Sequence, residues 1–248
     1  MAMFRHRRLR QRGLPAFVAG LIVLATTVTG AGAVTVGPRT VSFSGSLWAV
    51  KASTGLVGPG PNIFSDSPEN VWVDASGRLH LRITYRDGRW LAAEVVLDRS
   101  LGYGTYRFDV DSPTGNLDPN VVLGLFTWSD DPAYNHREID IELARWGNPA
   151  APNAQYVVQP YDHVGNLFNF LHTGDAPTTH QFTWASNRVS FLSTAAGRTI
   201  ATWKYGGRDV PRAGNERTRI NLWLDGGAPP TDGNEVEVVQ SRFSFSRR

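Results

Sequence analysis

The 248-residue chain contains no cysteine. Its absence excludes a disulfide framework, a thiol nucleophile and a cysteine-based zinc site. Beyond residue 33 the sequence also lacks internal repeats, low-complexity linkers, blocks of like charge and long runs of helical period. Residues 34–248 are therefore predicted to form one domain, with enough chain to build a sizeable hydrophobic core.

Residues 1–33 have the pattern of a secretory signal peptide. Five arginines between Arg5 and Arg12 precede a mostly apolar, uncharged run over 14–30, and residues 31–33 fit a small-residue cleavage site. We expect cleavage and secretion; the alternative is an uncleaved anchor, since no charge lies between Arg12 and Arg39. Removing these five charges changes the net charge from +3 to −2, which gives no support for nucleic-acid binding.

About a dozen short strand-like segments follow, separated by turn residues. In residues 79–84, for example, apolar and polar side chains alternate, and Asp87-Gly88 next to them is a strong hairpin signal. This pattern predicts an all-β fold, an antiparallel β-sandwich. A sandwich of this size can curve, so that one face becomes a concave groove for a ligand.

The segment 136–143 carries the main functional signal. Its period of two places Ile139, Ile141 and Leu143 on one face of a strand, and the carboxyl side chains of Glu138, Asp140 and Glu142 on the other. Neighbours on one face are roughly 6.6 Å apart. Two charges at that distance repel by roughly 0.6 kcal/mol in water and about 2.5 kcal/mol at an effective dielectric constant near 20. We expect at least one carboxyl to keep its proton near neutral pH.

A protonated carboxyl beside an ionised one is what acid-assisted cleavage of a glycosidic bond requires. Acidic side chains on the solvated face of a half-buried strand are, however, also common in proteins without catalytic function. The acidic row alone leaves both interpretations open, and the flanking sequence favours the first.

With this motif the chain resembles family 16 of the glycoside hydrolases. The family signature is Glu-x-Asp-x-Glu, or a bulged form with one extra residue, and this sequence matches the unbulged form. Other similar segments keep the order that they have in the family and extend over residues 45–245: Gly102–Tyr106, Phe126–Trp128, Gln155-Tyr156, His180–Trp184 and Asn221–Trp223.

The resemblance implies a jelly-roll sandwich whose concave face holds a polysaccharide, and a retaining double displacement. By position Glu138 would be the nucleophile and Glu142 the general acid/base, with Asp140 between them to tune the nucleophile. Retention needs carboxyl groups only about 5–5.5 Å apart. Four residues of extended strand span about 13 Å, so the two glutamates must lean towards each other.

Aromatic and amide side chains complete the predicted site. Sugar rings pack their apolar faces on indoles, and their hydroxyls need planar polar partners. We therefore expect substrate contacts from Trp128, Trp146, Trp223, Gln155 and Asn221. Trp146 is included because it continues the parity of the acidic row, if the strand extends that far. For each tryptophan the alternative is a place in the core.

The predicted enzyme needs no cofactor and no catalytic metal. Many family members hold a structural calcium with an aspartate on the last strand, where this chain has the uncharged Gln240, so only backbone carbonyls could supply ligands for a calcium there. The expected partner is a polysaccharide, for a monomer that binds no nucleic acid and has no membrane span after cleavage. The unbulged motif favours a β-1,4- or mixed β-1,3/1,4-glucan. A transglycosylase, a non-catalytic carbohydrate-binding module or lectin, and a structural sandwich are the alternatives.

Overall fold

The structure, a computed structural model, describes residues 36–173 and 177–247. The predicted signal peptide lies outside these ranges. Within them no helical segment could serve as a membrane span.

The described residues fold into strands, with two single-turn 3-10 helices, η1 (Asn135–Arg137) and η2 (Asp225–Gly227). The first half of the sandwich has neighbouring strands in the order β11 (Leu167–Phe170), β10 (Ala154–Val158), β9 (Ile139–Leu143), β8 (Val121–Trp128), β15 (Arg217–Leu224), β6 (Arg89–Leu97), β2 (Ser46–Lys51) and β1 (Val36–Phe43). The second half has the order β4 (Val71–Val73), β5 (Leu79–Arg86), β16 (Val236–Arg247), β7 (Gly104–Val110), β12 (Thr178–Ala185), β13 (Arg188–Ala195) and β14 (Arg198–Tyr205).

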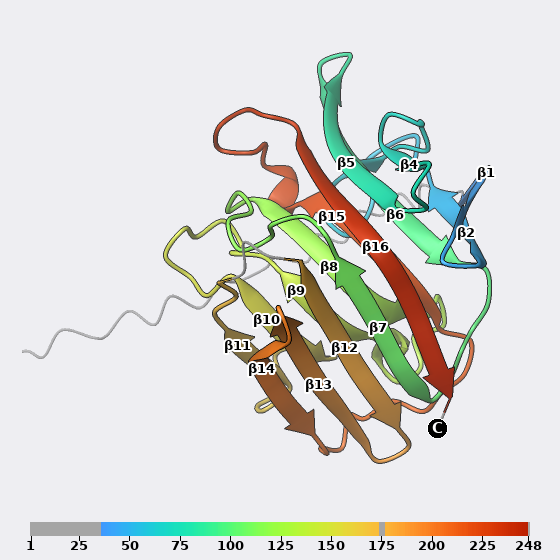
Figure 1. Ribbon diagram of the computed structural model, residues 1–248, viewed down its shortest axis with the longest axis vertical. Helices are drawn as coiled ribbons and strands as arrows, with labels where there is room; N and C mark the ends of the chain where they lie inside the picture. Colours follow the sequence, from blue (N-terminus) through green and yellow to red (C-terminus); the bar gives the residue numbers. More distant parts are fainter. Residues whose placement is uncertain (1–35, 174–176, 248) are drawn as a thin grey trace, which may run out of the picture. The chain divides into compact units, whose positions relative to one another are not determined.

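The two halves are joined where β5 and β6 form a hairpin around the predicted Asp87-Gly88 turn, in which both residues have positive φ. All pairings in these two series are antiparallel, and only the short β3 (Ile63–Phe64) runs parallel to β6. Figure 1 shows β16, β7, β12 and β13 of the second half lying side by side. The predicted all-β, antiparallel sandwich is confirmed.

The core lies between the two halves and follows the strand alternation. Ile139, Ile141 and Leu143 of β9 are fully buried, as the period of two predicts, in one cluster with Phe108 of β7 and Phe182 of β12. Burying one such aliphatic side chain contributes roughly 1.5–3 kcal/mol. Because β9 is anchored by its odd-numbered residues, its even-numbered side chains must point to the opposite face of the sheet.

Candidate active site

The acidic side chains of β9 lie in the middle of the sheet, between β8 and β10. Asp140 is opposite Phe126 of β8 and Val157 of β10, and Glu142 is opposite Gly124 and Gln155. Asp140 is only 3% exposed, whereas Glu138 and Glu142 are partly buried. Two hydrogen-bonded strands therefore hold the acidic strand on both sides and fix the direction of its carboxyl groups.

These carboxyl groups line a cleft with a volume of about 510 Å³. Glu138, Asp140 and Glu142 all contribute to its wall. Of the predicted sugar contacts, Trp128, Asn221 and Trp223 also line it. The fold thus brings together, in one cavity, the three acids of residues 138–142 and side chains that are up to 85 residues further along the chain.

Each carboxyl group has a specific polar partner. Gln155 donates from Nε2 to Oε2 of Glu142 over 2.6 Å. Gln159 donates from Nε2 to Oδ2 of Asp140 over 3.1 Å. Asp140 is in turn hydrogen-bonded to Glu138, in the sense that lowers the pKa of Glu138 and raises that of Asp140. Asp140 is therefore the donor in this pair, which stabilises a carboxylate on Glu138.

Burial shifts the titration of the whole row upwards. It raises the pKa of Glu138 to about 8, with the charge of Glu142 as the next cause. It raises the pKa of Glu142 to about 7 and that of Asp140 well above the ordinary range. Desolvation penalises each ionised carboxyl, so the row holds fewer than three negative charges at neutral pH, as its spacing predicts.

Beyond burial, specific partners act differently on the two glutamates. Glu138 receives the hydrogen bond from Asp140 and feels the positive charge of Arg219, and both contacts lower its pKa. Glu142 receives only the neutral amide of Gln155, and the negative charge of Asp225 raises its pKa. These contacts oppose the effect of burial at Glu138, and at Glu142 the charge of Asp225 adds to it, while the pKa of Glu138, about 8, stays above that of Glu142, about 7.

A segment with unusual backbone geometry leads into the acidic strand. The four residues Tyr134–Arg137, none of them glycine, have φ angles of 55°, 51°, 60° and 54°. Left-handed backbone costs roughly 1–2 kcal/mol per such residue. The segment is held by the ion pair between Arg137 and Asp131 at 3.0 Å and by the bond from Ser129 N to His136 O at 2.7 Å. This turn sets the direction in which Glu138 enters β9.

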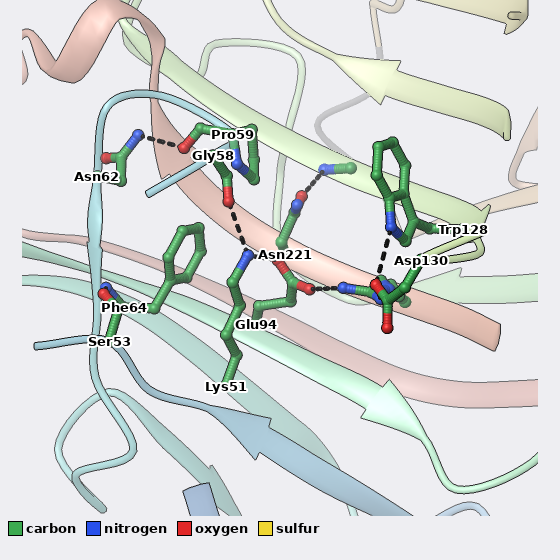
Figure 2. Close-up of polar contacts among 12 residues, drawn as sticks. Lys51, Ser53, Gly58, Pro59, Asn62, Phe64, Glu94, Trp128, Asp130 and Asn221 are labelled. Carbon is green, nitrogen blue, oxygen red and sulfur yellow. Dashed lines mark hydrogen bonds and ion pairs between the residues drawn. The ribbon is translucent and has the colours of Figure 1, made fainter. Parts of the chain in front are cut away.

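Trp128 stands at the end of β8 with one face covered. The ring of His136 stacks on it, with 4.1 Å between ring centroids and 7° between planes. The indole Nε1 of Trp128 also donates to Oδ1 of Asp130 at 3.3 Å (Figure 2). Trp128 lines the cleft, and these two neighbours fix the orientation of its indole there.

Asn221 is almost completely buried beneath the cleft surface. Its Oδ1 accepts a hydrogen bond from the backbone N of Gly124 at 3.1 Å. A Cβ atom on residue 124 would lie 2.4 Å from that oxygen, so only glycine fits at this position opposite Glu142. Asn221 therefore supports the floor of the site under the acidic row.

Trp223 and Trp146 form a pair, but only Trp223 reaches the cleft. Trp223 is 7% exposed and lines the cleft, and the two ring centroids are 5.9 Å apart in an edge-to-face arrangement. The expectation that the strand parity continues to Trp146 is wrong. The strand β9 ends at Leu143, and Trp146 has a φ angle of 52°. Trp146 packs behind Trp223, and its contact with a sugar stays a prediction.

Four charged side chains in the cleft wall were missed by sequence reasoning. Three of them, Lys51, Glu94 and Arg219, come from β2, β6 and β15, and the fourth is Asp130. Glu94 is the single charge in the otherwise apolar run 90–97, and Arg219 shares the parity of Asn221 and Trp223. Those two patterns are the signals that could have located the group.

The position expected for a structural calcium carries no carboxylate. Gln240, at the position expected for the calcium aspartate, is fully buried, and neither Oε1 nor Nε2 has a hydrogen-bond partner. Among residues 36–173 and 177–247, no three His, Asp or Glu side chains are grouped so that they could hold an ion. The uncharged side chain of Gln240 does not fit a calcium site that depends on a carboxylate at this position.

The fold is similar to that of solved glucanases. A Bacillus licheniformis β-glucanase is 17% identical over 86% of this chain and 100% of its own, with a TM-score of 0.61. A β-1,3-glucanase from Mycobacterium marinum is 18% identical over 85% and 95%, with a TM-score of 0.64. A laminarinase from Flavobacterium sp. UMI-01 is 11% identical over 81% and 93%, with a TM-score of 0.62. No protein-family model and no curated protein matches the sequence. The chain thus has the curved, antiparallel β-sandwich fold of the β-glucanases over more than four fifths of its length.

Proposed function

We propose that the protein is a secreted, retaining glycoside hydrolase that cleaves internal β-linkages of a polysaccharide. The observation that carries the proposal is the cleft in which Glu138, Asp140 and Glu142 lie together, each carboxyl with its own hydrogen-bond partner. Placing three acids in a partly desolvated row costs stability, and a protein that only binds sugar gains nothing from that cost. Acid-assisted cleavage requires it.

In the proposed mechanism the ionised Glu138 attacks the anomeric carbon while Glu142 donates its proton to the leaving oxygen. Asp140 keeps its proton and donates a hydrogen bond to Glu138. Glu142 then removes a proton from water, which attacks the same carbon and releases Glu138 with net retention of configuration. The raised pKa of Glu142, about 7, suits a group that must give a proton and take one back near neutral pH.

For the substrate we propose a β-1,4- or mixed β-1,3/1,4-glucan. The unbulged Glu-x-Asp-x-Glu motif supports this choice. The fold is similar both to that of a solved prokaryotic β-1,3-1,4-glucanase (lichenase) derived from a mouse hindgut metagenome and to that of the β-1,3-glucanase, so the motif carries the choice of linkage. Trp128 and Trp223 would stack on glucose rings and Gln155 and Asn221 would meet hydroxyls. Trp146 would support the ring of Trp223 by packing against it.

The proposal is tested by release of reducing ends from a panel of β-glucans and galactans. We expect the wild type to cleave at least one glucan, and Glu138→Gln and Glu142→Gln to lose about 10³-fold or more in kcat/KM while keeping their fold. Asp140→Asn should lose less. Proton NMR of the first product should show the β-anomer, and an initial α-anomer would contradict the proposed double displacement.

The same panel separates three alternatives. A carbohydrate-binding module would bind a glucan without releasing reducing ends from it. A transglycosylase would use the same residues but transfer the glycosyl group to a sugar, so that products longer than the substrate would accumulate. Failure to bind any glycan would favour a purely structural sandwich.

A further inference from the structure

Beside the acidic row, four side chains form a continuous chain of charges across the cleft. Lys51 donates from Nζ to Oε2 of Glu94 at 2.9 Å, and Arg219 donates from Nη1 to Oε1 of the same carboxylate at 3.0 Å. Arg219 also donates from Nη2 to Oδ1 of Asp130 at 3.3 Å. Figure 2 shows Lys51 and Glu94 on one side of this chain and Asp130 beside Trp128 on the other. All of these residues line the cleft.

The buried members of this chain do not balance in charge. The side chains of Lys51, Glu94 and Arg219 are 4%, 1% and 13% exposed. Two cations thus share one buried anion in a largely desolvated place, and the other negative charges near Arg219 come from Asp130 and, when it is ionised, from Glu138. Both oxygens of Glu94 are already occupied. The second carboxylate that pairs with Arg219 is Asp130, whose side chain is 94% exposed. An ion pair with such an exposed partner contributes little to stability.

Two donors converge on one oxygen position at this end of the cleft. Asp130 Oδ1 accepts both from Nη2 of Arg219 and from Nε1 of Trp128, each at 3.3 Å. Both distances are longer than the usual 2.7–2.9 Å or so of a charge-assisted hydrogen bond. The position therefore has two oriented donors and a positive charge, but its present occupant is a loosely held surface side chain.

The register of the strands locates this position relative to the acids. Arg219 on β15 is opposite Phe126 on β8, and Phe126 is opposite Asp140 on β9. Two strand spacings of about 4.8 Å separate the backbones of Arg219 and Asp140 by roughly 10 Å. The donors thus lie next to the proposed bond-cleaving groups but do not coincide with them, so they would contact a neighbouring sugar unit.

We propose that Arg219 and Trp128 bind a carboxylate group of the polysaccharide, so that the preferred substrate is an acidic β-glucan containing uronic acid units. This proposal rests on the proposed function. Asp130 holds the place of the substrate carboxylate and yields it when the polymer binds. A sugar hydroxyl could accept the same two hydrogen bonds, but a carboxylate would form a charge-assisted bond with Arg219, which is roughly twice as strong as a neutral one.

The test compares a β-glucan oligosaccharide with the same oligosaccharide after oxidation of part of its C6 hydroxyls to carboxylates. Affinity is measured by calorimetry with Glu138→Gln, which leaves the oligosaccharides uncleaved. We expect the oxidised form to bind about tenfold tighter at an ionic strength of about 0.02 M, and the difference to shrink strongly at about 0.5 M.

The decisive variant is Asp130→Asn, made in the Glu138→Gln background. It removes the competing carboxylate from an exposed position and should widen the preference for the oxidised ligand about a further tenfold. Arg219→Gln should abolish the preference, and Arg107→Gln, a change of an exposed arginine in the other half of the sandwich, should leave it unchanged. Equal affinities for the two ligands at low salt in the Asp130→Asn variant would overturn the proposal, whether or not Arg219→Gln folds.

The hydrolase proposal and the carboxylate proposal can fail independently of each other. If no polysaccharide is cleaved by the wild type, the hydrolase proposal fails, while the affinity comparison still reports on the carboxylate. If neutral and oxidised glucans are cleaved with equal kcat/KM and bound equally well, the hydrolase proposal holds and the carboxylate proposal fails.

Discussion

Gln155 and Glu142 face each other across the β9–β10 pair, and the amide Nε2 lies 2.6 Å from the carboxylate Oε2. The two residues are 13 positions apart, and the strand pairing alone makes them neighbours. Because an amide donor favours the ionised form of a carboxyl, this contact lowers the pKa of Glu142 against the opposing effect of burial.

Replacing Gln155 by leucine should move the pH dependence of catalysis to higher pH. Without the donor the pKa of Glu142 rises above about 7, so the proton donor of the first step stays protonated in more basic solution. We expect the basic limit of kcat/KM to shift upwards, with about a tenfold loss at the optimum from roughly 1.5 kcal/mol of lost hydrogen bonding. Full pH profiles measure both effects.

Gln181→Leu is the matched control, because Gln181 lies on β12 in the other half of the sandwich. Its pH profile should coincide with that of the wild type. A Gln155→Leu profile that keeps the basic limit of the wild type would show that the contact does not tune Glu142.

Replacing Glu142 by glutamine should stabilise the protein in neutral and basic solution. Below pH 4.5, the ordinary pKa of glutamate, the carboxyl is protonated in both the folded and the unfolded protein, so its burial carries no cost of desolvating a charge. Between 4.5 and about 7 the unfolded chain releases the proton first, so stability decreases as the pH rises. Above a pH of about 7 the carboxyl is ionised in the folded protein as well, and the full cost of its desolvation lowers the stability. Glu142→Gln should gain on the order of 2 kcal/mol at pH 8, and little at pH 4.

Urea unfolding at both pH values measures this gain. A variant that is no more stable than the wild type at pH 8 would mean that the carboxyl is well solvated in the folded protein.

His180 should make the protein sensitive to acid. Its ring is fully buried between Thr178 and Ser193, with contacts of 3.0 Å to Oγ1 and 2.8 Å to Oγ. Burial lowers the pKa of His180 from 6.5 to about 3. Above pH 6.5 the ring is neutral in both the folded and the unfolded protein. As the pH falls from 6.5 to 3 the unfolded chain binds the proton first, so stability is lost over that window.

His180→Asn should be less stable than the wild type at pH 7, where the ring packs well, but should lose less stability on acidification. We expect the difference in slope to amount to on the order of 3 kcal/mol between pH 7 and pH 4, by denaturant titration. His163→Asn, a change at a more exposed histidine, serves as the control. Equal slopes for His180→Asn and the wild type would disprove the assignment.

Gly124→Ala should damage the site without touching an acid. The new Cβ would lie 2.4 Å from Oδ1 of Asn221 and would displace the side chain that accepts from Gly124 N. We expect a loss of about 1–3 kcal/mol in the free energy of unfolding, typical of overpacking, and a clear fall in kcat/KM. Gly55→Ala, where a Cβ meets nothing within 4 Å, should change neither. A fully active Gly124→Ala would show that Asn221 does not support the site.

Local patterns in the sequence predicted part of this architecture. The period of two over residues 138–143 depends only on the geometry of a single extended strand, so both the buried face and the acidic face could be inferred before the fold was known. The hairpin at Asp87-Gly88 is equally local, since both positions require positive φ. Trp146 marks the limit of such reasoning, because parity says nothing about where a strand ends.

The sequence by itself determined that three acids share one face of a strand and that the chain forms an antiparallel β-sandwich. Only the tertiary structure decided which strands flank the acids, that Gln155 and Gln159 bond to Glu142 and Asp140, and that Lys51, Glu94 and Arg219 meet in the same cleft. The physical reason is that side-chain alternation is a property of neighbouring residues. Strand order, burial and the resulting pKa shifts depend instead on segments that lie far apart in the chain and are brought together by the shared core.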